Sequence, residues 1–154
     1  TERCGATGEQ RYRNMKGQDI TEFTARTDYL FQHHPATIGV GDGGNELGMG
    51  NLASVTPSVP TLVTDPCITQ STAPVICSVA NWGMYGIVAA LSIQRGKNIL
   101  PSIEEERDLV KRCVQMGAVD GASHKVEERV DGFTLEENSE VLAELHGLVE
   151  SRLH

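Results

Sequence analysis

The chain has 154 residues, 39% of them hydrophobic and 22% charged, which suits one folded domain and is too short for two domains of ordinary size. Its 21 acidic residues outnumber its 13 basic residues, so the net charge of −8 argues against a nucleic-acid partner, which needs a basic face. No stretch approaches the roughly 20 apolar residues of a membrane helix, which excludes a membrane partner as well.

The first predicted element is a helix that Asp19 or Thr21 caps, because a side-chain oxygen there accepts from unpaired backbone N–H groups. Pro35 ends this helix, since proline disfavours a helical residue before it. The predicted strands follow at residues 36–40, 60–64 and 74–80. The last two are almost continuously apolar, which is typical of strands covered on both faces.

Three further helices are predicted in the second half of the chain. Residues 84–94 are apolar almost all round, which predicts a buried helix. Ser102 with Glu105 and Thr134 with Glu137 are capping boxes, each of which opens a helix with apolar residues at three-to-four spacing. Between these two helices we expect a short hairpin or an extended crossover.

Buried strands mixed with helices predict an α/β fold for a single domain over residues 1–154. We expect three layers, a mostly parallel sheet flanked by helices, in a Rossmann-like arrangement. Ligands bind such sheets beyond the carboxyl ends of the strands. Two clusters of glycine and polar residues follow predicted strands directly, and this places a candidate site on those loops.

The first cluster is a glycine-rich loop at residues 41–50, with five glycines in ten residues. It lacks the dinucleotide fingerprint and the Walker loop, and the chain shows no signature for NAD or for pyridoxal phosphate. Asp42, Asn45 and Glu46 are catalytic candidates, since they suit a general base or contacts to a substrate ammonium. Asp42 and Glu46 also suit a divalent cation such as Mg²⁺. The alternative is a structural turn in which Asp42 bonds to its own backbone.

The second cluster follows the strand at residues 74–80. Asn81 opens a helix there, and backbone N–H groups at a helix start attract anions such as a substrate carboxylate. Trp82 and Tyr85 are candidates for the wall of a substrate pocket. In the alternative interpretation, Asn81 only caps the helix and Trp82 only packs.

A third segment, near the N-terminus, carries the cations Arg3, Arg13 and Lys16. Each is suited to a substrate carboxylate, and arginine can bind one with two parallel hydrogen bonds. The alternative is a solvated charged loop. No histidine pair has metal-ligand spacing and no serine sits in a nucleophile elbow, so a serine hydrolase has no support.

Several segments together resemble the D-glutamate cyclase-like C-terminal domain. The glycine-rich loop resembles that family's signature, and the resemblance spans nearly the whole chain in the right order. The other matching segments are Glu2-Arg3-x-Gly5 with residues 12–20, residues 78–86, residues 117–121 and residues 130–132.

The resemblance implies the C-terminal fragment of a larger protein, with an N-terminal region of the same polypeptide as its partner. It implies a mitochondrial matrix lyase of D-amino-acid metabolism that converts D-glutamate into 5-oxo-D-proline and water. Within that reaction we expect Asp42 or Glu46 to act as base, and Asn45, Asn81 and the helix start at Gly83 to stabilise an oxyanion. Arg3 would hold the other carboxylate, and Gly43 and Gly44 would contact the substrate.

Two rival functions stay open at this point. One is a non-catalytic, regulatory module that binds a small anion or nucleotide at the same loops. The other is metal-assisted hydrolysis through Asp42 and Glu46.

Overall fold

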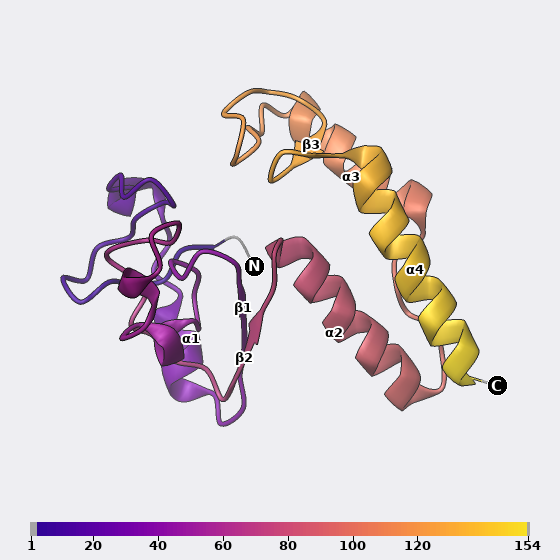
Figure 1. Cartoon of the computed structure of the whole chain (residues 1–154), viewed down its shortest axis with the longest axis horizontal. Coiled ribbons are helices and arrows are strands. Elements are labelled where there is room, and N and C mark those ends of the chain that lie inside the picture. Colours follow the sequence, from indigo (N-terminus) through magenta and orange to yellow (C-terminus); the bar gives the residue numbers. More distant parts are fainter. Residues whose placement is uncertain (1–2, 154) are drawn as a thin grey trace. The chain divides into compact units, whose positions relative to one another are not determined.

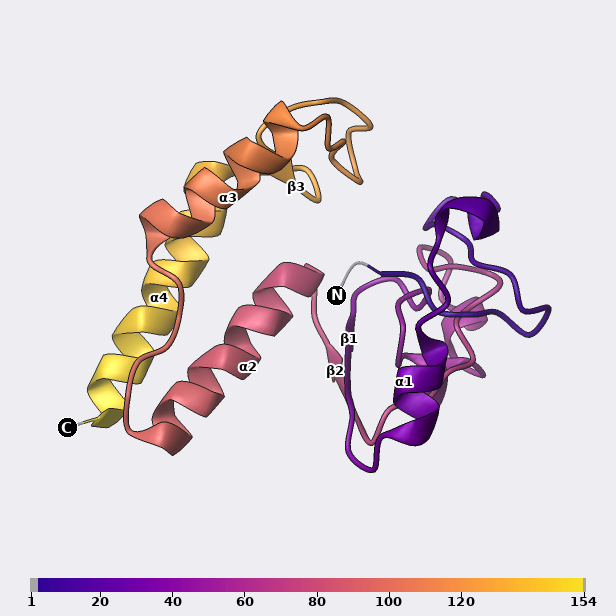
Figure 2. The same ribbon diagram turned by 180° about the vertical axis from the view of Figure 1, so that it is seen from behind.

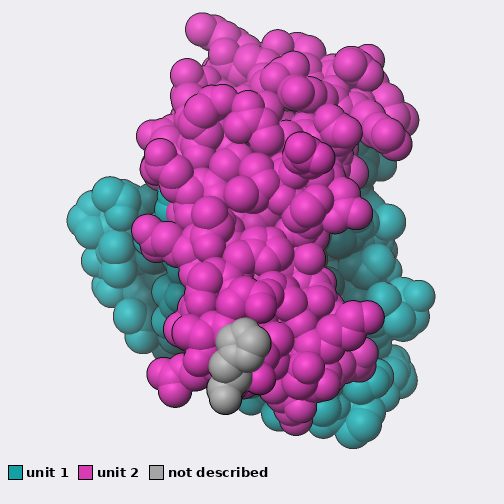
Figure 3. Space-filling model, turned by 90° about the vertical axis from the view of Figure 1, so that its right-hand side faces the viewer, with its two compact units in different colours: residues 1–83 teal, residues 84–154 magenta. Residues whose placement is uncertain are grey.

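The computed structural model describes residues 3–153, and the chain divides into two compact units, residues 1–83 and 84–154 (Figure 3). A single domain over the whole chain stays a prediction. In chain order the α-helices and strands are α1 (Asp28–His33), β1 (Ile38–Gly41), β2 (Ala73–Ile76), α2 (Ala80–Arg95), α3 (Ile103–Gln115), β3 (Arg129–Val130), β4 (Phe133–Thr134) and α4 (Leu135–Leu153) (Figure 1).

The parallel pair of β1 and β2 organises the first unit, with Val40 opposite Val75. This confirms strands within the predicted segments 36–40 and 74–80. The expectation that the second of these is covered on both faces is wrong for β2, where Ile76 is 69% exposed. Beyond the strand, Val79 is fully buried.

The prediction of a strand at residues 60–64 is wrong, because this segment forms turns. The Leu62 N–H donates to the Val59 carbonyl at 3.0 Å, and the Val63 N–H donates to the Gly43 carbonyl at 3.4 Å. The apolar character of the segment reflects burial of Val63, which is 5% exposed, against the rest of the unit rather than membership of a sheet.

The prediction of a single helix before Pro35 is also wrong. A short 3₁₀ helix at Thr21–Phe23 and the separate helix α1 take its place. Asp19 accepts from the Thr21 N–H at 2.9 Å, but the N-cap position of the 3₁₀ helix is Ile20 and no side chain caps it, so the predicted cap by Asp19 or Thr21 is wrong. Ala25 lies between the 3₁₀ helix and α1. Its carbonyl accepts a hydrogen bond from the Arg3 guanidinium at 2.7 Å and not from a helical N–H group.

Helices dominate the second unit, where α3 and α4 lie side by side (Figures 1 and 2). Both predicted capping boxes are confirmed. Ser102 accepts from the Glu105 N–H at 3.2 Å, and Thr134 accepts from the Glu137 N–H at 3.2 Å. Helix α2, predicted over residues 84–94, begins earlier, at Ala80 in the first unit, and continues into the second.

A short antiparallel hairpin of β3 and β4 precedes α4, which settles the choice between hairpin and crossover. Asp131 and Gly132 form its turn with φ angles of 51° and 82°, as expected where two central residues adopt left-handed conformations. Asp120 supports the hairpin by accepting from the Gly132 N–H at 3.0 Å.

The described residues are therefore a mixed α/β chain with a small parallel sheet and flanking helices. Over residues 3–153 the strands form one parallel pair and one antiparallel pair, so the three-layer, Rossmann-like arrangement is not confirmed. The four cysteines are free thiols. Within the same range, every helix is too short or too polar to cross a bilayer.

Candidate functional site

The glycine-rich loop folds around the carboxylate of Glu46, whose side chain is 1% exposed. One carboxylate oxygen accepts from the N–H groups of Asp42 at 3.2 Å and Gly43 at 2.8 Å. The other accepts from the Gly44 N–H at 2.7 Å. A buried charge is tolerated when hydrogen bonds replace its hydration, and hydrogen bonds to a charged acceptor are stronger than neutral ones. Glu46 therefore holds the loop in one conformation.

Two of the glycines explain why this sequence permits such a loop. A Cβ atom at Gly41 would lie 2.6 Å from a carboxylate oxygen of Glu46, so glycine leaves the space that this oxygen occupies. Gly44 has a φ of +90°, which favours glycine. Gly41 thus permits close approach of the backbone to a buried carboxylate, and Gly44 permits the positive φ of the loop.

Asp42 joins the glycine-rich loop to the start of α2. Its half-buried carboxylate accepts from the Ala80 N–H at 2.9 Å. The Cys77 N–H donates to the Gly41 carbonyl at 3.1 Å, which continues the pairing of β1 with the segment after β2. The two clusters predicted from the sequence therefore meet at the carboxyl ends of the two parallel strands. Asn81 directly follows Ala80, the residue that is hydrogen-bonded to Asp42.

Asn45 carries a buried acceptor without a partner. Its side chain is 6% exposed, and its amide nitrogen donates to Cys4 Sγ and to the Arg13 carbonyl, both at 3.3 Å. Its Oδ1 atom is buried and accepts no hydrogen bond from the residues that the structure describes. Such an atom costs about 1–3 kcal/mol in folding free energy, and in a native protein it marks a place for a ligand, a water molecule or stored strain.

The side chains of Arg3 and Tyr85 are engaged elsewhere. The Arg3 backbone lies beside the loop, where its carbonyl accepts from the Leu47 N–H at 2.9 Å. Its guanidinium, however, binds Ala25 and Thr27. Tyr85 lies in the second unit, where its hydroxyl donates to the Glu106 carboxylate. Of the predicted site residues, the structure thus brings together Asp42, the loop and the first turn of α2.

A small cavity of about 200 Å³ lies in the first unit, next to the glycine-rich loop. Two turns line it, residues 14–17 and residues 62–65. The carbonyl of Gly43 accepts from the Val63 N–H, so the cavity lining is bonded to the loop. Lys16 was predicted as a candidate cation, but no cavity was predicted beside it. The cavity depends on the turn at residues 62–65, in a segment whose apolar sequence predicted a strand.

Asp28 is a buried polar centre that the sequence analysis missed. It accepts from the Ala6 N–H at 2.9 Å, from the Tyr12 hydroxyl at 2.6 Å and from the Thr69 hydroxyl at 2.5 Å. Burial raises the pKa of Asp28, but these hydrogen bonds outweigh it and hold the pKa below its usual range. Burial and the bond to Asp28 raise the pKa of Tyr12 to about 12. A cavity of about 370 Å³ opens beside Asp28.

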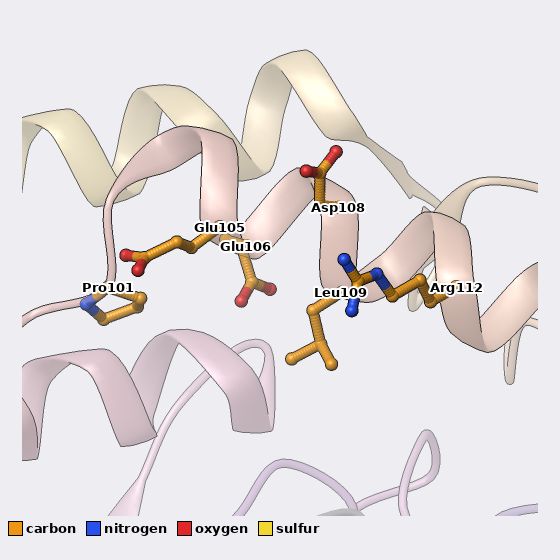
Figure 4. A pocket seen from close by; sticks show the side chains of 6 residues that line it. All are labelled: Pro101, Glu105, Glu106, Asp108, Leu109 and Arg112. Carbon is orange, nitrogen blue, oxygen red and sulfur yellow. The ribbon is translucent and has the colours of Figure 1, made fainter.

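A further cavity of about 330 Å³ runs along α3 in the second unit (Figure 4). Figure 4 shows the Glu106 carboxylate and the Leu109 side chain on the same side of this helix. Glu105 is occupied by its capping bonds to Ser102, and Glu106 accepts from Tyr85. These bonds cap the start of α3 and connect α3 to Tyr85 of α2.

Asp42 and Glu46 do not fit a divalent cation. Both oxygens of Glu46 accept backbone N–H bonds, whose positive ends would oppose a bound cation. Asp42 is bonded to the Ala80 N–H. Among residues 3–153, no group of three or more histidine, cysteine, aspartate and glutamate side chains could hold a metal ion.

The fold and the loop define a class: an α/β chain with a glycine-rich loop that follows a parallel strand and bonds to the start of a helix. The chain belongs to the family described as D-glutamate cyclase-like, C-terminal, whose model matches residues 1–146. It is similar to "D-glutamate cyclase, mitochondrial" from Homo sapiens, with 29% identity over 161 aligned residues. The match covers 86% of this chain and 26% of that relative, so the chain spans about a quarter of the relative's length.

Proposed function

We propose that this chain takes part in converting D-glutamate into 5-oxo-D-proline and water, with the glycine-rich loop as its substrate-binding element. Membership of the D-glutamate cyclase-like family and the name of the human relative support the reaction class. The observation that carries the choice of site is the 2.9 Å bond from the Ala80 N–H to Asp42, which joins the two predicted clusters.

The reaction sets clear requirements for such a site. The α-amine must lose a proton before it attacks the carbon of the side-chain carboxyl group. A C–N bond then forms, a C–O bond breaks, and the oxygen leaves as water after taking up protons. The site therefore needs a base for the ammonium group, and hydrogen-bond donors or a helix N-terminus for the negative charge that develops on the attacked group.

The residues of the first unit can share these tasks. Asp42 serves as the base, and Asn81, in the first turn of α2, offers hydrogen-bond donors to the developing negative charge. The Gly83 N–H donates to the Val79 carbonyl at 3.2 Å and takes no part. Gly43 and Gly44 bring backbone close to the substrate. Glu46 acts as a positioning residue, because its oxygens hold the loop amides. Arg3 and Tyr85, engaged elsewhere, take no part in this proposal.

The wider context follows from the relative. Because the human protein is named as mitochondrial, we place this chain in the mitochondrial matrix within this proposal. The chain matches 26% of that relative, so we propose that further regions of a longer polypeptide act with it as its partner.

One observation favours a second function, a non-catalytic module that binds a small anion. Glu46, one of the two candidate bases, is wholly occupied in holding the loop together. A loop held in one conformation by these hydrogen bonds is suited to binding a small anion, even if the reaction takes place elsewhere in a longer protein.

The replacement Asp42→Asn separates these two functions. Asparagine keeps an oxygen that can accept from the Ala80 N–H, but it cannot take a proton at pH 7. If Asp42 is the base, 5-oxoproline formation should fall by about 10²- to 10⁴-fold while D-glutamate still binds. Asp108→Asn, an exposed position on α3, is the matched control. Unchanged turnover in Asp42→Asn would remove this residue from catalysis and leave the binding module.

A further inference from the structure

We propose that the cavity between residues 14–17 and 62–65 is where an acidic amino acid binds, with Lys16 holding a carboxylate and Asn45 Oδ1 accepting from the ammonium group. Met15 is the movable cover between the cavity and Asn45. The choice of D-glutamate as ligand rests on the proposed function, whereas the position of the cavity does not.

The size of the cavity fits a small metabolite. Its volume of about 200 Å³ is several times the roughly 30 Å³ that one water molecule occupies in the liquid. It has room for a free amino acid and too little for a nucleotide, since pockets for drug-sized ligands begin at about 300 Å³.

Lys16 and Asp65 are the two charged residues that line the cavity. Asp65 pairs with Arg13 at 2.8 Å, and Arg13 also lies 3.7 Å from Glu9. No ion pair within residues 3–153 involves Lys16. Lys16 is therefore the charged group of this lining that is available to a ligand carboxylate.

The backbone that carries Lys16 is already fixed in place. The side-chain oxygen of Asn14 accepts from the N–H groups of Lys16 and Gln18, both at 3.0 Å. Gly17 completes the turn with a φ of +74°. An ordered backbone reduces the entropy lost when a ligand binds, so the cost that remains is the ordering of the Lys16 side chain.

Met15 and Asn45 both lie beside Gly43, on the side where a side chain would project. A Cβ atom built on Gly43 would lie 1.8 Å from Met15 Sδ and 3.0 Å from Asn45 Oδ1. Met15 also lines the cavity and is 46% exposed, and its unbranched thioether can adopt another rotamer readily. When it does, the buried acceptor on Asn45 becomes reachable from the cavity, and a ligand ammonium group supplies its missing hydrogen bond.

Calorimetric titration with D-glutamate tests the role of Lys16. The Lys16→Gln variant should bind D-glutamate on the order of tenfold more weakly than the wild-type protein, because one charge-assisted contact is lost. Lys97→Gln, an exposed lysine in the second unit, is the matched control and should bind as the wild type does. Equal affinity in Lys16→Gln, or no binding of D-glutamate to the wild-type protein, overturns the proposal.

Methyl NMR of ¹³C-labelled methionine locates the ligand without any need for turnover. The Met15 signal, assigned from Met15→Leu, should shift in proportion to bound D-glutamate. Met116, which is 90% exposed in the second unit, should not shift. Binding that leaves Met15 unchanged overturns the site. If Met15 shifts but no 5-oxoproline forms, the cavity stands and the catalytic proposal fails. If 5-oxoproline forms, but Lys16→Gln binds D-glutamate as the wild type does and the Met15 signal does not shift, the cavity proposal fails and the catalytic proposal stands.

Discussion

The replacement Glu46→Gln tests whether a buried carboxylate holds the glycine-rich loop. In the best orientation, the glutamine oxygen keeps the bonds from Asp42 and Gly43, each weakened by about 1 kcal/mol by the loss of charge. The glutamine NH₂ group then faces the Gly44 N–H, and a buried donor without an acceptor costs about 2 kcal/mol. We therefore expect a loss of about 4 kcal/mol, a large part of the 5–15 kcal/mol typical of a domain.

Urea denaturation followed by tryptophan fluorescence measures this loss. Trp82 is the single tryptophan of the chain, and it lies two residues after Ala80, whose N–H binds the loop through Asp42. The exposed Glu140→Gln on α4 is the control and should stay within about 0.5 kcal/mol of the wild type. A loss below about 1 kcal/mol for Glu46→Gln, with an unchanged dependence on urea, would refute the idea that these three bonds maintain the loop.

Other predictions concern the parts around the loop. Hydrogen bonds outweigh burial and lower the pKa of Asp28, so its contribution to stability is present above about pH 4 and is lost as the pH falls through the folded-state pKa. Asp28→Asn should remove this part of the acid dependence, as urea midpoints at about pH 3 and pH 6 would show. Thr134→Ala should destabilise α4 by about 1 kcal/mol in thermal melts, since it removes an N-cap, and an equal melting temperature would contradict that. Leu142→Ala, at a fully buried position of α4, should cost about 2–5 kcal/mol by urea denaturation, and a value under about 1 kcal/mol would contradict its place in the core.

Features that depend on residues close in sequence could be predicted from the sequence. The capping boxes at Ser102 and Thr134 each link two residues three apart, so the pattern alone locates both helix starts. The strand before the glycine-rich loop and most of helix α2 could be predicted for the same reason. The meeting of the two clusters also followed, because parallel strands place their carboxyl ends at one edge.

Features that depend on distant partners could not be predicted in this way. The turn at residues 60–64 exists because Val63 bonds to Gly43, twenty positions earlier, and nothing in the local pattern marks that contact. The break in the first predicted helix coincides with Arg3 binding Ala25. Glu46 was a candidate base and cation ligand, because carboxylates are almost never fully buried unless paired. Its partners are backbone N–H groups, which every residue except proline has and which therefore leave no signal in the sequence.

The role of the loop in binding D-glutamate is tested most directly by backbone amide NMR during a titration with this ligand. Our proposals predict saturable shifts for Gly43, Gly44 and Asn45 and for the first turn of α2, with the amides of α4 unchanged. Amides of the loop that stay fixed at a D-glutamate concentration that supports product formation would contradict the central claim, since the substrate would then bind elsewhere.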